Sequence, residues 1–155
     1  MILSSHVAAG FAVGVTVSNP IAGFLLGLVS HHLLDLIPHT DIGSDGVSIN
    51  NIFENKNSFK KLLLDGLFTL VIILVVLSSR GCSVVMLFSV LGAIFPDIID
   101  NSPFWSPYLR RKFPFNYYHY FHGKFHFTIM NKRYFYIGYI TQIMVVAISL
   151  YLVVK

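Results

Sequence analysis

The stretch 59–100, "FKKLLLDGLFTLVIILVVLSSRGCSVVMLFSVLGAIFPDIID", decides the fold class of this chain. It contains two long apolar runs, at about 59–79 and 82–100, with only Arg80 and Gly81 between them. An α-helix that crosses the hydrocarbon core of a bilayer needs ~20 mainly apolar residues. The stretch therefore predicts two membrane helices joined by a tight turn.

The composition of the whole chain agrees with a membrane protein. Of its 155 residues, 55% are hydrophobic and only 12% are charged, whereas a soluble domain carries about 25% charged residues. The length predicts a single domain over residues 1–155. The single cysteine, Cys82, excludes an intramolecular disulfide and a cysteine-based zinc knuckle.

Three further apolar segments, at about 3–17, 21–37 and 134–154, complete the expected fold. We predict an all-α fold: a polytopic integral membrane bundle of about five hydrophobic helices, with an aromatic, basic interfacial segment at about 105–130. The first two helices are short for a span, so they are either tilted or form a re-entrant hairpin. The pairs Gly10–Gly14 and Gly23–Gly27 predict that these two helices pack tightly on each other.

The basic residues predict an orientation in the membrane. Nine of the eleven Lys and Arg residues lie in or beside the two polar connections, and these are Lys56, Lys60, Lys61, Arg110, Arg111, Lys112, Lys124, Lys132 and Arg133. The positive-inside rule places both connections on the cytoplasmic side of a plasma or inner membrane. Because topology explains the basic residues, the expected partner is the lipid bilayer and not nucleic acid. The oligomeric state stays open.

The same topology gathers all seven histidines and all seven acidic residues at the cytoplasmic side. The densest part is "SHHLLDLIPHTD", residues 30–41. There His31 precedes Asp35 by four residues and His32 precedes it by three, so either pair can share a helix face. Ionisable groups are costly near the membrane interior, and neutral imidazoles and carboxylates bind divalent ions. The pattern predicts a divalent metal site, with zinc favoured and manganese or iron as alternatives.

Several of these residues also have a simpler interpretation. His6 is equally consistent with a capping or headgroup-facing role. Asp65 lies one turn after Lys61 and is suited to an interfacial ion pair with it. Pro96 can end the helix expected at about 82–100, and the Asp97 side chain can accept hydrogen bonds from backbone N–H groups there. The gathering of all these groups on one side favours the metal site over the separate explanations.

The order of the motifs resembles the YdjM-like family of membrane-bound metal-dependent hydrolases, also described as LexA-binding, inner-membrane-associated hydrolases. The resemblance rests on "SSHVAAGFAVG", "SHHLLDLIPHTD", an aspartate in the next helix, "LGAIFPDIID" and "FHGKFH", from His6 to about His126. The commoner family form of the last motif has an arginine-glycine pair and a threonine-histidine-serine ending, which this chain lacks. The resemblance implies a divalent metal site and a hydrolytic activity. Its polar signature would be His6, His32, Asp35, His39, Asp97 and His122 or His126.

Together, the residues and the resemblance predict a membrane-bound metal-dependent hydrolase that acts on a phosphoester or lipid-linked substrate. The candidate metal ligands are His6, His31, His32, Asp35, His39, Asp97 and His126. The candidate catalytic groups are Asp100 or Asp65 as general base and His122 as general acid or further ligand. His119, His122 and His126 line one stripe if their segment is helical. The candidate headgroup-binding residues are Arg110, Arg111 and Lys112.

Two other classes of function remain as alternatives. A non-catalytic membrane protein can use the same ligand types to hold a structural ion that joins its helix ends. A transporter is less consistent with the sequence, because nothing titratable lies in the outer halves of the expected spans, so no proton or ion relay crosses the membrane.

Overall fold

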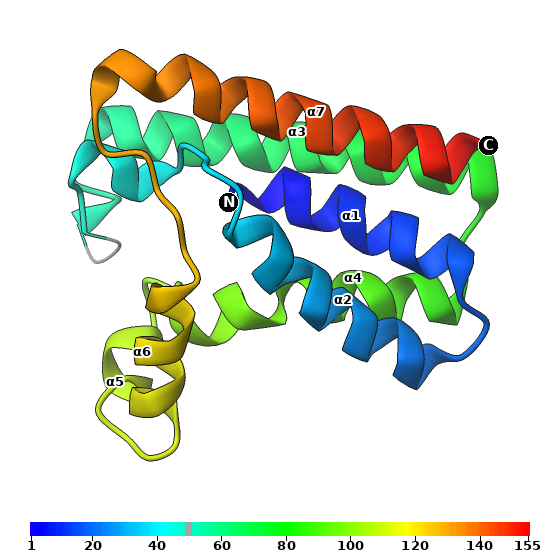
Figure 1. The fold of residues 1–155 in the computed structure, drawn as a ribbon, viewed down its shortest axis with the longest axis horizontal. Helices are drawn as coiled ribbons and strands as arrows, with labels where there is room; N and C mark the ends of the chain where they lie inside the picture. The colour runs from blue at the N-terminus through cyan, green and yellow to red at the C-terminus, as the bar shows by residue number, and fades with distance from the viewer. Residues whose placement is uncertain (49–50) are drawn as a thin grey trace.

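The computed structural model in Figure 1 describes residues 1–48 and 51–155. The described residues form α-helices and short 3-10 turns with no strand, which confirms the all-α expectation. The elements are α1 (Leu3–Thr16), α2 (Pro20–Asp35), η1 (Ile42–Asp45), α3 (Lys56–Arg80), α4 (Val84–Asp100), α5 (Ser106–Leu109), α6 (Phe115–Lys124), η3 (Lys132–Tyr134) and α7 (Phe135–Val154).

Helix α1 is the centre of the bundle. It contacts α2, α3, α4 and α7, while α2 packs along α4 and α3 runs beside α7 (Figure 1). Its buried residues Val7 and Phe11 form one apolar core with Ile72 of α3, Met86 of α4 and Val146 of α7. Because α1 is apolar on all its faces, it is buried among the other helices.

The sequence predicted that the glycine pairs pack α1 and α2 on each other. Instead, these glycines face α4. A Cβ on Gly14 would lie 2.6 Å from the Cα of Met86, and one on Gly27 would lie 2.2 Å from the carbonyl oxygen of Ser89. Both contacts are with α4, which therefore approaches α1 and α2 backbone to backbone. The small residues set the position of α4 because a side chain would fill the space that its backbone occupies.

The observed helix ends differ slightly from those expected. Helix α2 ends at Asp35, two residues before the expected end. Helix α3 begins at Lys56 because the Asn55 side chain accepts hydrogen bonds from the next turn. Helix α4 continues through Pro96 to Asp100, so the proline does not end it.

Because successive long helices alternate in direction, five polar ends meet at one end of the bundle. These are the starts of α1, α3 and α7 and the ends of α2 and α4, next to which α5 and α6 pack (Figure 1). The expected gathering of histidines and acids on one side follows from this alternation.

Two stretches, Lys56–Arg80 and Lys132–Val154, are long and apolar enough to cross a membrane. Most of their side chains point outward, and Leu67 of α3 and Ile143 of α7 are 61% and 67% exposed. Helices α1, α2 and α4 are shorter, with 14, 16 and 17 residues.

Candidate metal centre

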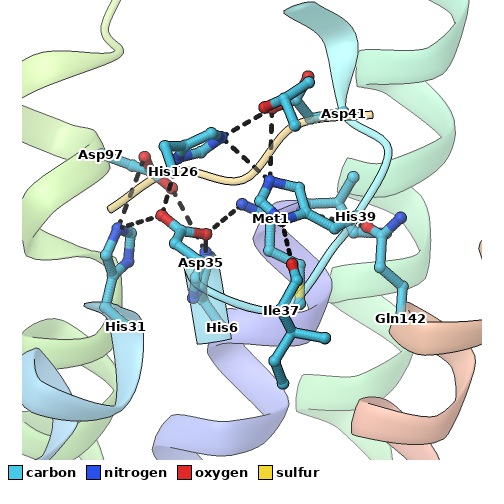
Figure 2. Close-up of polar contacts among 12 residues, drawn as sticks. Met1, His6, His31, Asp35, Ile37, His39, Asp41, Asp97, His126 and Gln142 are labelled. Carbon is cyan, nitrogen blue, oxygen red and sulfur yellow. Dashed lines mark hydrogen bonds and ion pairs between the residues drawn. The ribbon is translucent and has the colours of Figure 1, made fainter. Parts of the chain in front are cut away.

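Asp35, the last residue of α2, is the centre of the polar cluster. It is fully buried, and its Oδ2 lies 3.1 Å from His31 Nε2 and 2.9 Å from His126 Nδ1. Its Oδ1 lies 3.3 Å from His6 Nε2 and contacts the amino group of Met1 (Figure 2). A buried carboxylate surrounded by imidazoles has the chemistry of a metal ligand.

Around Asp35, the described residues form three groups with the spacing of metal ligands. In each group, one candidate ligand atom per residue lies within 4.8 Å of the others. The groups are His6, His31 and Asp97; His31, Asp35 and His122; and Asp35, His39 and His126. Residues from α1, α2, α4, α6 and both polar connections therefore meet in one site.

The hydrogen bonds of the ring nitrogens indicate which atom each histidine presents. His31 Nδ1 lies 2.8 Å from the Ala93 carbonyl oxygen, and His39 Nδ1 lies 2.8 Å from that of Ile37. His122 Nδ1 lies 2.9 Å from Asp100 Oδ2. These oxygens only accept, so each Nδ1 carries the hydrogen and donates it. This leaves the Nε2 atoms to face the cluster, as in histidines that bind metals.

The Nε2 atoms of His31 and His122 lie only 3.2 Å apart. With both Nδ1 atoms donating, two neutral rings would point lone pairs at each other, so the pair requires a cation between them or a proton on one ring. Burial lowers the pKa of His122, but hydrogen bonds to Asp100 and Asp35 outweigh it and raise this pKa to about 9. The cluster therefore attracts a positive charge, which a divalent ion would supply.

His6 provides a second test of the fit to a metal. It is fully buried, and among the described residues neither ring nitrogen has a hydrogen-bond partner. Its ring stacks on that of His31 at 4.0 Å, and its Nε2 lies 3.9 Å from Asp97 Oδ2. A buried imidazole without a hydrogen bond is costly, and coordination of an ion would offset that cost.

His126 reaches the cluster from an extended segment and not from α6, which ends at Lys124. Phe127 donates its N–H to the Asp35 carbonyl oxygen at 2.8 Å, and Ile129 donates to that of His39 at 2.8 Å. These bonds fasten the segment along the chain that follows α2. The expected stripe of three histidines on one helix is therefore wrong, since only His119 and His122 lie on α6.

Asp41 belongs to the same part of the site. Its Oδ2 lies 2.8 Å from His126 Nε2 and accepts a hydrogen bond from Thr128 at 3.0 Å. Burial raises the pKa of Asp41, but hydrogen bonds from His126 and His39 outweigh it and hold this pKa below its ordinary value. Asp41 is thus a charged neighbour of the third ligand group.

The structure shows which of the adjacent residues His31 and His32 belongs to the ligand groups. His31 enters two of the three ligand groups, whereas His32 enters none. The His32 ring packs edge-on against Phe121 at 5.4 Å and lies near Tyr118. Of the two adjacent histidines, His31 is the one that faces Asp35.

Asp65 belongs to none of the three ligand groups. Its two carboxylate oxygens accept hydrogen bonds from the backbone N–H groups of Leu3 and Ser4, so it caps α1. The ion pair considered from the sequence does not form, since Lys61 binds Asp45.

Asp100 accepts hydrogen bonds from three side chains. It binds His119 Nδ1 at 2.8 Å, His122 Nδ1 at 2.9 Å and Arg110 Nε at 2.9 Å. The rest of the basic run, Arg111 and Lys112, is exposed. Asp100 thereby orients a candidate ligand, a half-exposed histidine and an arginine at once.

The sequence analysis missed Gln142, a buried amide in α7. Its Nε2 donates to the Thr40 carbonyl oxygen at 2.7 Å, and its Oε1 accepts from the Ile2 N–H at 3.2 Å. It therefore ties α7 to the segment that carries His39. The signal was present, since a lone amide in an apolar helix needs a partner.

A cavity of about 560 Å³ adjoins the cluster. Its wall combines apolar groups such as Leu3 and Leu62 with polar residues, which are Asp41, Asp65, Asp97, Asp100, Arg110, His119, His122 and His126. The site thus has room for a small substrate or a headgroup beside the candidate ligands.

Comparisons with protein-family models, with curated proteins and with solved structures find no match to this chain. The resemblance to YdjM-like hydrolases therefore stays a prediction.

Proposed function

We propose that this protein is a membrane-bound metal-dependent hydrolase whose site is the cluster around Asp35. The observation that carries the proposal is the pair of Nε2 atoms, on His31 and His122, that face each other at 3.2 Å beside Asp35 Oδ2. Zinc is the favoured ion, with manganese or iron as alternatives, because the donors are imidazoles and carboxylates without a thiolate.

The proposed location is the cytoplasmic face of a plasma or inner membrane. The exposed apolar side chains of α3 and α7 support insertion, since a soluble monomer rarely exposes so much apolar surface. Helices α1, α2 and α4 would lie in the membrane with them as the remaining members of a five-helix bundle. The basic connections at the polar end support the orientation.

The proposed substrate is a phosphoester or a lipid-linked ester. Arg110 lines the cavity, and its Nε and one terminal nitrogen bond to Asp100 and Asn101. Its other terminal nitrogen would bind an anionic oxygen of the substrate. His119 also lines the cavity, with its side chain 46% exposed and its Nδ1 bonded to Asp100, the arrangement of a general base and its orienting carboxylate. A bound divalent ion would polarise the substrate oxygen and make a water more acidic.

The test is hydrolysis by detergent-purified, full-length protein loaded with zinc or manganese. The substrates are bis(p-nitrophenyl) phosphate, p-nitrophenyl acetate and phosphatidylglycerol vesicles. We expect hydrolysis of a phosphoester that Asp35→Asn reduces more than about 100-fold, since ligand loss exceeds the 10–100-fold effect of outer partners. Asp45→Asn, which removes a carboxylate outside the cluster, is the matched control and should retain activity. Metal-loaded protein that hydrolyses none of these substrates would instead support the structural-ion alternative.

A further inference from the structure

The three ligand groups overlap in a way that bears on the number of ions. The first group and the third group share no residue, because one uses His6, His31 and Asp97 and the other uses Asp35, His39 and His126. The middle group takes His31 from one and Asp35 from the other. Three ligands are therefore available to each of two ions, whereas a separate third ion in the middle group would compete with both.

The Asp35 carboxylate contacts both outer groups. Its Oδ1 lies 3.3 Å from His6 Nε2, in the first group. Its Oδ2 lies 3.1 Å from His31 Nε2, also in the first group, and 2.9 Å from His126 Nδ1, in the third. Two-metal hydrolytic sites hold their ions about 3.5–4 Å apart, a separation that one carboxylate spans when it uses both oxygens. Figure 2 shows Asp35 between His6 and His31 on one side and His126 on the other.

The surrounding charges permit two divalent ions. Asp35, Asp41 and Asp97 lie within the cluster, with side chains 0%, 17% and 21% exposed. Asp100 stands directly behind His122. Arg110 pairs with Asp100 and the Met1 amino group contacts Asp35, so the four carboxylates offset part of the positive charge of two divalent ions.

We propose that the site holds two divalent ions bridged by the Asp35 carboxylate. One ion is bound by His6, His31 and Asp97, and the other by His39 and His126 with Asp41 beside them. The inference rests on the proposed metal site and deepens it, because it assigns the number of ions and the bridging ligand. His122 Nε2 lies 3.2 Å from His31 Nε2 and 3.4 Å from Asp35 Oδ2, so His122 would join His31 as a further ligand of the first ion.

The experiment measures ion content and magnetic coupling in the full-length protein. Chelator-stripped protein in detergent is reloaded with zinc and analysed by mass spectrometry, and a second sample is loaded with Mn²⁺ for electron paramagnetic resonance. We expect two zinc ions per chain and an exchange-coupled Mn²⁺ spectrum in the wild type. Asp97→Asn and His39→Gln should each retain one ion and give the spectrum of isolated Mn²⁺, and Asp45→Asn should retain two coupled ions.

The outcomes separate this inference from the proposed hydrolase. One ion per chain in the wild type, lost in both ligand variants, would overturn the two-ion centre and leave a mononuclear hydrolase standing. Two coupled ions in a protein inactive on all three substrates would support the centre and contradict the hydrolase. Failure to bind any ion would overturn both. The wild-type measurements decide the number of ions even if a variant does not fold.

Discussion

A single methyl group added at Gly27 should weaken metal binding at His31, which lies one helical turn further along α2. The Cβ of Gly27→Ala would lie 2.2 Å from the Ser89 carbonyl oxygen of α4, whereas ordinary contact begins at 3.4 Å. The shortfall requires α2 to move away from α4 by roughly 1 Å. His31 lies four residues after Gly27 on α2. The Nδ1 of His31 donates a hydrogen bond of 2.8 Å to the Ala93 carbonyl oxygen of α4. A shift of that size would stretch this bond beyond hydrogen-bonding range.

The expected magnitude combines three effects. Overpacking costs about 1–3 kcal/mol, and loss of the His31 hydrogen bond costs about 1 kcal/mol. Replacing a helical glycine with alanine returns about 1 kcal/mol. We therefore expect a net destabilisation of about 1–3 kcal/mol. Zinc affinity should fall about 10–100-fold, as when an orienting partner of a ligating histidine is removed.

The assay is zinc competition against a chromophoric chelator, together with thermal unfolding in detergent. Gly66→Ala on α3 is the matched control, since a Cβ there meets nothing within 4 Å. The control should keep the wild-type zinc affinity and gain up to about 1 kcal/mol of stability. If Gly27→Ala behaves like Gly66→Ala, the close approach of α2 to α4 does not position His31, and the reasoning is refuted.

Three further predictions concern the groups that orient the ligands. Gln142→Leu leaves the buried Thr40 carbonyl oxygen without its donor, at a cost of about 1–3 kcal/mol; thermal unfolding and zinc competition should both register the loss, and unchanged values would contradict a positioning role. Asp100→Asn replaces an acceptor shared by His119 and His122, so zinc affinity should fall about 10–100-fold in the same competition assay. In chelator-treated protein, burial lowers the pKa of His122, but hydrogen bonds to Asp100 and Asp35 outweigh it and raise this pKa from 6.5 to about 9. The protonated ring therefore stabilises the metal-free fold fully below pH 6.5, and this stabilisation is lost as pH rises through about 9. The melting temperature should fall across that window, and His122→Gln should flatten the slope.

The sequence by itself determined the helices and the side of the bundle on which the chemistry lies. Apolar runs long enough to span a bilayer predict helices whatever their partners, because every backbone group in such a run must be paired internally. Short turns such as Arg80-Gly81 make successive helices antiparallel, so polar ends such as those near Asp35 and Asp97 must meet. The candidate ligands could therefore be chosen from residue type and position alone.

Only the tertiary structure decided which of these residues face one another. His31 and His32 lie about 100° apart around α2, and the position of α4 and α6 selects His31. The glycine pairs predicted that α1 and α2 approach each other closely, but the close approach is that of both helices to α4. His126 enters from an extended segment, and Gln142 reaches the site across the bundle. Helical periodicity describes a single element, whereas these choices depend on packing between elements far apart in the chain.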